Sequence, residues 1–189
     1  RLEAARSSVA SVKQVLGEMQ SRILSMALLH ETLYRGGSFA QIDLSRYLGQ
    51  LANQVFRSIA AAGHRIALDI NVALALVNLE QAVPCGLLLN ELLSNSLKHG
   101  FPDQRSGRIS VSLSVSEADR GITLQVADKG VGLPSDWEKR REGSLGLQLV
   151  ADLTRQLRGT LTIGTSPGAS FTLRFVPAPK ESQIGRAHV

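Results

Sequence analysis

Residues 90–103, which read NELLSNSLKHGFPD, carry a carboxylate, an amide and an ammonium group at helical spacing. Glu91, Asn95 and Lys98 lie one turn apart on one helix face, because side chains three and four positions apart are neighbours on a helix. Such a row of groups can serve a hydrated Mg²⁺ ion and a chain of phosphates. For this pattern taken alone, a polar face that only meets solvent is the alternative.

Two glycine-rich segments follow this helix, DKGVGLP at residues 128–134 and GSLGLQLV at residues 143–150. A final Gly-x-x-Phe segment, GASF, comes at residues 168–171. A single Gly-x-Gly is usually only a turn, so each segment alone is a weak signal. The order of helix, first turn, second turn and final motif is hard to obtain by chance.

The helix with the polar row also has an apolar face, formed by Leu89, Leu92, Leu93 and Leu97. We expect it to begin near Glu80, so that Pro84 falls in its first turns, where proline is tolerated. Further helices are expected at residues 43–62, with Asp43 as N-cap, and at residues 143–157. Alternating patterns predict strands at residues 65–71, 108–115, 121–127, 160–164 and 170–176.

A regular apolar repeat precedes these elements. Its positions alternate steps of three and four: Val9, Val12, Leu16, Met19, Ile23, Met26, His30 and Leu33. This heptad seam predicts a coiled-coil-like helix, and residues 1–6 resemble the end of a preceding helix. A hairpin with one apolar stripe per helix usually pairs with a second copy, so we expect a homodimer joined by a four-helix bundle. Packing of this helix on the downstream domain is the alternative.

The order of elements predicts an α+β fold: an N-terminal helical hairpin, then an α/β sandwich whose mixed sheet is covered by helices on one face. We expect a partial dimerisation region at residues 1–37, a connecting helix at 38–64 that packs with the next domain, and a nucleotide-binding domain at 65–179. Residues 180–189 are expected to be a tail. Its last six residues, IGRAHV, match a translated sequencing adapter and are interpreted as non-native. Since the chain begins at Arg1, it is expected to be a piece of a longer protein.

Composition excludes few functions. The 189 residues carry a net charge of +5, but the basic residues are scattered, so nucleic-acid binding is not expected. No apolar run is long enough to span a membrane, so we expect no membrane contact by this fragment and a cytoplasmic location, with an anchor possible only upstream. The single cysteine, Cys85, is expected to be a small buried hydrophobe.

Taken together, these motifs resemble the ATP site of histidine kinases, within the superfamily of Hsp90-like, gyrase-like and MutL-like ATPases. The segment SRILSMALLHETLYRGG at residues 21–37, followed by IDLSRYLGQL at 42–51, is similar to histidine kinases of the HisKA_2 type. The related HWE subfamily has a Trp-x-Glu signature near the first glycine turn. Trp137 and Glu138 lie after that turn, with the wrong spacing, so HisKA_2 is the better match.

The resemblance implies ATP and Mg²⁺ as cofactors and assigns roles to the polar helix. Asn95 would supply an oxygen ligand to the Mg²⁺ that bridges the ATP phosphates. Glu91 would orient or deprotonate the attacking group, and Lys98 and His99 would face the phosphates. The other histidines, at positions 30, 64 and 188, are expected in the helical seam, a loop and the tail.

The glycine segments receive roles from the same resemblance. Asp128 would accept a hydrogen bond from the adenine amino group, and Gly130 and Gly132 would let the backbone approach the base and sugar. Leu133 would line the adenine pocket. Amide groups at the start of the next helix would hold phosphate oxygens; that stretch comprises Gly143, Ser144, Leu145 and Gly146. The basic run at residues 139–141 is interpreted as solvated.

Two departures from the family pattern bear on function. Ala169 stands where the superfamily often has an adenine-contacting Thr, with Ser170 or Thr172 as candidate replacements. The family's phosphoacceptor histidine would fall roughly four helical turns before Arg1. We therefore expect the ATP-binding core of a bacterial two-component sensor histidine kinase, which relays phosphoryl groups to a response regulator receiver domain. The alternatives are a related ATPase, an anti-sigma-type serine kinase, or an inactive dimeric interaction module.

Overall fold

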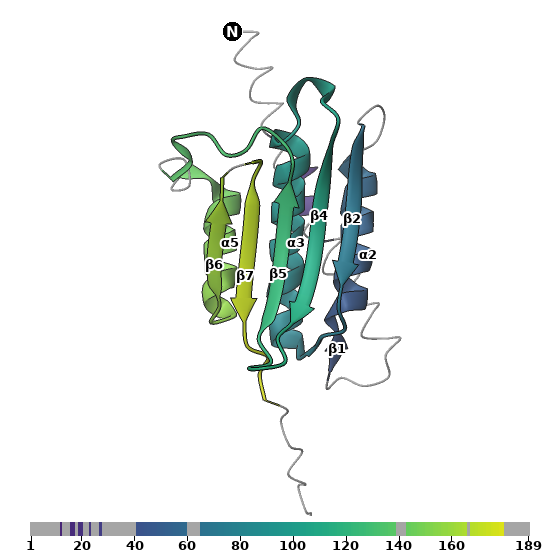
Figure 1. Ribbon diagram of the computed structural model, residues 1–189, viewed down its shortest axis with the longest axis vertical. Helices are drawn as coiled ribbons and strands as arrows, with labels where there is room; N and C mark the ends of the chain where they lie inside the picture. Colours follow the sequence, from purple (N-terminus) through teal and green to yellow (C-terminus); the bar gives the residue numbers. More distant parts are fainter. Residues whose placement is uncertain are drawn as a thin grey trace, which may run out of the picture.

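The computed structural model describes residues 41–59, 65–138, 143–165 and 167–179, together with residues 12, 16, 17, 19, 20, 23 and 27 (Figure 1). Several expectations lie outside these residues: most of the heptad seam, the first hairpin helix, residues 60–64, the basic run at 139–141 and the tail. His30, His64 and His188 lie outside them as well. Among the described residues, no helix is long and apolar enough to cross a membrane.

A five-stranded sheet forms the centre of the domain, with strand order β2-β4-β5-β7-β6. The strands are β2 (Ile66–Val72), β4 (Gly107–Val115), β5 (Ile122–Asp128), β6 (Thr160–Gly164) and β7 (Ser170–Phe175). Only β2 and β4 are parallel, and the other neighbours are antiparallel, so the predicted mixed sheet is confirmed. The alternating sequence patterns located all five strands to within one or two residues.

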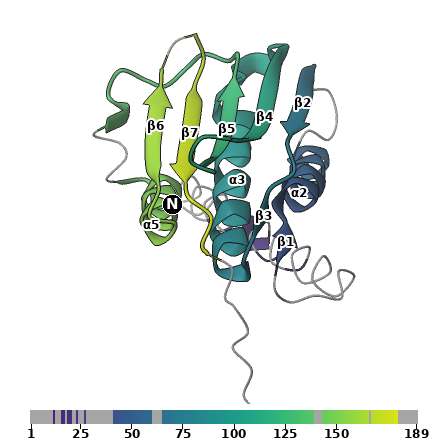
Figure 2. The same cartoon turned by 60° about the horizontal axis from the view of Figure 1, so that its bottom comes forward.

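Within the ranges that the structure describes, three helices cover one face of this sheet (Figures 1 and 2). They are α2 (Leu44–Ile59), α3 (Leu79–His99) and α5 (Leu145–Gln156). Asp43 caps α2 as predicted, since its Oδ1 accepts a hydrogen bond from the Arg46 amide. Helix α3 begins one residue before its expected start, capped by Asn78, which accepts from the Gln81 amide at 3.0 Å. Pro84 is the sixth residue of α3 and so lies in its first two turns, as expected.

Helix α3 is the central element of the core, because α2 and α5 flank it and the sheet lies beneath it (Figure 2). Its leucines are buried as predicted, but so are several polar side chains: Asn90, Glu91, Ser94 and Ser96. Within the predicted row, Glu91 is buried, Asn95 is partly buried and Lys98 is exposed, so a solvated polar face is the wrong interpretation for Glu91. Cys85 is buried as expected, and burial raises the pKa of its thiol.

A second, two-stranded sheet pairs β1 (Ile42–Asp43) with β3 (Leu76–Val77) in antiparallel register. The sequence patterns did not predict it, because two-residue strands carry no measurable alternation. A short 3₁₀ turn, η1 (Pro102–Gln104), follows α3. In the chain, β3 directly precedes and η1 directly follows α3, the helix with the predicted catalytic row.

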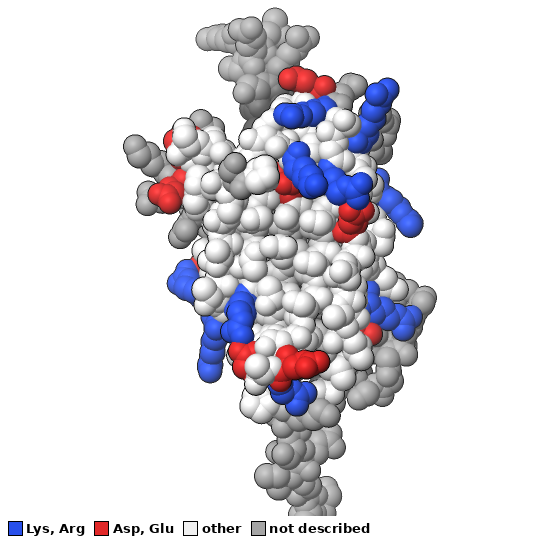
Figure 3. All heavy atoms as spheres, in the orientation of Figure 1, with Lys and Arg blue, Asp and Glu red and all other residues white. Residues whose placement is uncertain are grey.

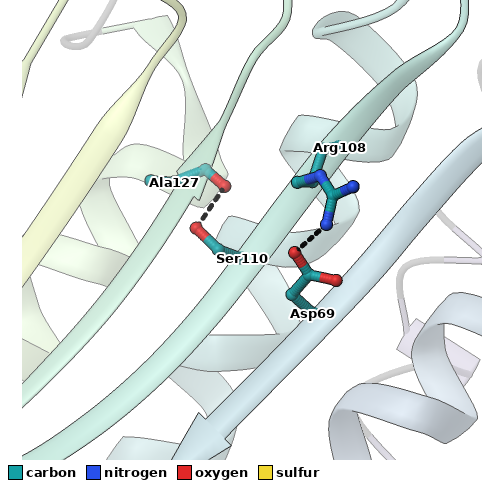
Figure 4. A network of polar contacts seen from close by, with 4 residues as sticks. All are labelled: Asp69, Arg108, Ser110 and Ala127. Carbon is teal, nitrogen blue, oxygen red and sulfur yellow. Dashed lines mark hydrogen bonds and ion pairs between the residues drawn. The ribbon is translucent and has the colours of Figure 1, made fainter.

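No helix of the described residues covers the other face of the main sheet, and Figure 3 looks onto that face. Its centre is uncharged and lined by small polar side chains such as Ser110, while charges gather near its two ends. Near one end Arg108 of β4 pairs with Asp69 of β2 (Figure 4). The predicted site residues of α3 lie on the opposite, helix-covered face.

Candidate functional site

The carboxylate and amide of the polar row point towards the start of α5. A Cβ added at Gly146 would lie 3.0 Å from Glu91 Oε2 and 3.9 Å from Asn95 Nδ2. Glu91 is buried and Asn95 is partly buried, whereas Lys98 and His99 in the last turn of α3 are exposed. A residue larger than glycine at position 146 would therefore press on the Glu91 carboxylate.

Asp128 ends β5 and is held by three donors. Its Oδ1 accepts hydrogen bonds from the amides of Gly130 at 2.9 Å and Ala169 at 3.2 Å, and its Oδ2 accepts from the Ser96 hydroxyl at 2.8 Å. The side chain is 5% exposed. The three donors therefore fix the orientation of this carboxyl group at the end of β5.

The first glycine turn packs directly against the end of α3. A Cβ added at Gly130 would lie 2.7 Å from the Gly100 carbonyl carbon and 2.8 Å from Asp128 Oδ1, so only glycine fits there. The Val131 amide donates to the Gly100 carbonyl at 2.9 Å, which ties the turn to the helix. Gly132 has φ of +78°, a left-handed conformation that also favours glycine.

The second glycine segment starts α5, as predicted. Ser144 is its N-cap and accepts from the Leu147 amide at 3.4 Å. The amides at the start of a helix give its N-terminus a partial positive charge, which suits phosphate oxygens. Gly143 is exposed, with no atom within 4 Å of an added Cβ, and Leu145 is 65% exposed.

A cavity of about 510 Å³ joins these parts. It lies between the end of α3, the first glycine turn and the start of α5. The predicted residues that line it are Asn95, His99, Asp128, Gly132, Leu133 and Ser144. The others are not among its lining residues: Glu91 faces Gly146, Gly130 backs onto α3, and Lys98, Gly143 and Leu145 are exposed.

Eight further lining residues were not assigned to the site from the sequence: Ser96, Gly100, Val131, Pro134, Trp137, Leu147, Ala169 and Phe171. Phe171 belongs to the noted Gly-x-x-Phe motif, and Trp137 lies in the segment between the glycine turns. Ser96 was the hardest to find, because it follows Asn95 directly and its partner Asp128 is 32 residues away in the chain. Helical spacing alone does not show such a contact.

The two candidate replacements for a threonine at position 169 do not reach the cavity. Ala169 and Phe171 line it, whereas Ser170 and Thr172 lie on the opposite side of β7. Thr172 Oγ1 accepts from Gln125 Nε2 at 3.0 Å on the helix-free face of the sheet. Neither hydroxyl can therefore contact a ligand in the cavity.

The donor set around the cavity fits a weakly held, hydrated cation. Among the described residues, no group of three or more His, Cys, Asp and Glu side chains gathers in one place. The Asn95 amide beside the cavity, with the Glu91 carboxylate one turn away, suits Mg²⁺, which keeps most of its waters and uses few protein ligands besides phosphates.

Comparison with known proteins agrees with this geometry. Residues 80–180 match the family of histidine kinase-, DNA gyrase B- and HSP90-like ATPases, and residues 1–59 match the HisKA_2 histidine kinase family. The blue-light-activated histidine kinase 2 of Erythrobacter litoralis is 28% identical over 94% of this chain and 51% of its own length. Sensor histidine kinase PdtaS of Mycobacterium tuberculosis is 28% identical over 97% of the chain and 36% of its own length.

A solved structure shows the same fold. The histidine kinase domain of the Erythrobacter litoralis EL346 blue-light activated kinase has a TM-score of 0.76 and 27% identity, and the match covers 84% of this chain and 74% of that one.

The chain thus belongs to the family of histidine kinase-, DNA gyrase B- and HSP90-like ATPases. Within that family it is a catalytic core of the sensor histidine kinase type, of the HisKA_2 group. It spans about half of the length of the first relative and about a third of the second.

Proposed function

We propose that the protein binds Mg-ATP in the cavity between α3 and α5 and transfers the γ-phosphoryl group to a histidine, for relay to an aspartate of a response regulator. The observation that carries this proposal is the Asp128 carboxylate, held by three donors at one side of a cavity that Asn95 lines as well. An acceptor for a nucleobase and a ligand for a phosphate-bound cation are thus on one wall.

The adenine end of the cavity is formed by Asp128, the first glycine turn and Leu133. Gly130 and Gly132 keep the backbone close to the base and sugar. The phosphate end is formed by Asn95 and the amides that begin α5, with Ser144 as the cap. When bound, Mg²⁺ would neutralise charge on the phosphates.

The proposed chemistry uses the buried carboxylate of Glu91. An imidazole nitrogen attacks the γ-phosphorus, the bond to the ADP oxygen breaks, and ADP leaves. Glu91 orients the imidazole or accepts its N–H proton. Lys98, in the last turn of α3, adds positive charge on the phosphate side of the site, and His99 beside it faces the phosphates. Catalysis of this kind depends mostly on positioning and on charge neutralisation.

Partners and location are parts of the same proposal. Val12, Leu16, Met19 and Ile23 of the heptad seam are helical and more than half exposed. An exposed apolar seam supports a homodimer, in which a second copy covers these side chains. The response regulator would contribute a receiver domain, and the ATP-dependent reaction would take place in the cytoplasm.

The domain boundaries follow from this arrangement. We assign dimerisation to residues 1–37, the connection to residues 38–64 and ATP binding to residues 65–179. The packing of α2 against α3 supports a connection that is fixed on the ATP-binding domain.

The first test is a nucleotide titration of the Asn95→Ala variant. Trp137 is the only tryptophan and lines the cavity, so its fluorescence reports occupancy directly. In the wild-type chain Mg²⁺ should raise the affinity for ATP above that measured in EDTA. In Asn95→Ala the two dissociation constants should become equal, because the cation has lost its protein ligand.

Asn71→Ala is the matched control, since Asn71 is exposed on strand β2 and lies outside the cavity lining. It should retain the wild-type Mg²⁺ dependence. If Asn95→Ala retains it as well, the metal assignment is wrong. Phosphoryl transfer itself requires the full-length protein, in which ATP labelled at the γ position should produce an acid-labile phosphohistidine.

A further inference from the structure

The protein donors around Asp128 use most of the capacity of its carboxylate to accept hydrogen bonds. A carboxylate offers about four lone-pair directions. The amides of Gly130 and Ala169 occupy both directions of Oδ1, and the Ser96 hydroxyl occupies one of Oδ2. One acceptor direction therefore remains, on the oxygen that Ser96 contacts.

We propose that Ser96 is a positioning residue for nucleobase recognition: its hydroxyl orients Asp128 so that the remaining acceptor direction of Oδ2 receives an exocyclic amino group of the bound base. This proposal rests on the proposed function, because it requires that a nucleotide occupies the cavity. Ser96 and Asp128 both line that cavity, so their shared hydrogen bond lies in its wall.

The orientation of Ser96 is set by its place in the fold. Ser96 is 5% exposed, and its backbone carbonyl accepts the Gly100 amide at 2.9 Å at the end of α3. The Gly100 carbonyl in turn accepts the Val131 amide. The last turn of α3, the first glycine turn and the segment before β7 thus share one hydrogen-bond network around Asp128. Ser96 has little room to choose another rotamer.

The hydrogen-bond direction decides which base the pair accepts. The Ser96 hydroxyl has one proton and donates it to Asp128, so its remaining capacity towards the cavity is as an acceptor. An ionised Asp128 also only accepts. A base with an amino group at this point satisfies the pair, whereas a carbonyl oxygen there would leave buried acceptors unpaired. The site is therefore selective for adenine over guanine.

No other hydroxyl takes this place among the described lining residues. Ser144 also lines the cavity, but it caps α5 by accepting from the Leu147 amide. Ser170 and Thr172 lie on the far side of β7, as described above. Position 169 is an alanine and has no hydroxyl group. Ser96 thus supplies the side-chain hydroxyl beside the base.

The test compares two ligands in the Ser96→Ala chain by isothermal titration calorimetry. One ligand is Mg-ATP, and the other is the Mg complex of purine riboside triphosphate, which lacks the 6-amino group. Affinity for ATP should fall about tenfold, the loss expected for one hydrogen bond to a charged group. Affinity for the purine riboside analogue should change less than about twofold, because that ligand has no amino group to misplace. Ser96→Thr, which keeps the hydroxyl, should restore the preference for ATP.

Ser110→Ala is the control, because Ser110 donates to the Ala127 carbonyl on the helix-free face of the sheet (Figure 4). It should bind both ligands like the wild type. Equal losses for both ligands in Ser96→Ala, or no loss for either, would overturn the positioning role while leaving ATP binding established. If the wild-type chain binds no adenine nucleotide, the proposed function fails, and this inference fails with it.

Discussion

The close contact between the first glycine turn and α3 yields a quantitative prediction for Gly130→Ala. The added methyl group would lie 2.7 Å from the Gly100 carbonyl carbon and 2.8 Å from Asp128 Oδ1, distances that real Cβ atoms essentially never show. The neighbouring atoms belong to backbone or to a buried carboxylate, so they cannot swing away. The turn must move instead, by on the order of 1 Å.

Such a movement breaks two hydrogen bonds of 2.9 Å, from the Gly130 amide to Asp128 Oδ1 and from the Val131 amide to the Gly100 carbonyl. A neutral bond contributes about 1 kcal/mol and a bond to a charged group about 2 kcal/mol. If binding requires the original turn, the combined loss of about 3 kcal/mol corresponds to roughly a hundredfold in affinity for Mg-ATP. Titration followed by Trp137 fluorescence, with thermal unfolding of the same samples, measures both effects.

Gly49→Ala is the matched control. Gly49 lies inside α2, and its nearest neighbour to an added Cβ is Val72 Cγ2 at 3.9 Å. This variant should be more stable by about 0.5–1 kcal/mol, because alanine favours a helix interior, and its affinity should not change. The reasoning is refuted if Gly130→Ala binds Mg-ATP within about threefold of the wild type and unfolds at the same temperature.

Two further predictions concern stability and titration. Gly86→Ala should lower the free energy of unfolding, measured by urea denaturation, by about 1–3 kcal/mol. The new Cβ would lie 2.6 Å from Cζ of the buried Tyr47 ring. An unchanged free energy of unfolding would show that the ring can move. Hydrogen bonds from Ser116 and Arg174 lower the pKa of Asp119 from 3.8 to about 2. The contribution of these hydrogen bonds to the stability of the folded protein is therefore fully present above pH 3.8 and is lost as the pH falls towards 2. Ser116→Ala and Arg174→Gln should each raise this pKa in an NMR titration, and an unchanged pKa in either variant would remove that residue from the causes.

The element order was predictable because its signals are local. Alternation in β4 and β5 and the leucine pattern of α3 depend on residues within a few positions of one another, so no tertiary information was needed. The cap at Asp43 followed from its type and place before an apolar helix. The β1–β3 pair was missed because its strands are two residues long and pair across the whole of α2 and β2.

The chemistry of the site was only partly visible in the sequence. Asn95 and Asp128 could be singled out from the sequence because the motifs that contain them have a recognisable spacing and order. That Glu91 is buried against Gly146 was not visible, since a polar row on a helix predicts exposure unless a second helix covers it. The place of α5 over this row depends on packing between segments about fifty residues apart.

The sequence by itself determined the class of fold through the periodicity of its helices and strands, and it indicated the family through the resemblance of its motifs. It also singled out Asn95 and Asp128, which line the cavity. Only the tertiary structure decided how the site is completed. It directs Ser170 and Thr172 away from the cavity, because alternate side chains of a strand face opposite sides of the sheet. It also brings the Ser96 hydroxyl to Asp128, a contact between a helix end and a strand end that exists only after the two elements have packed.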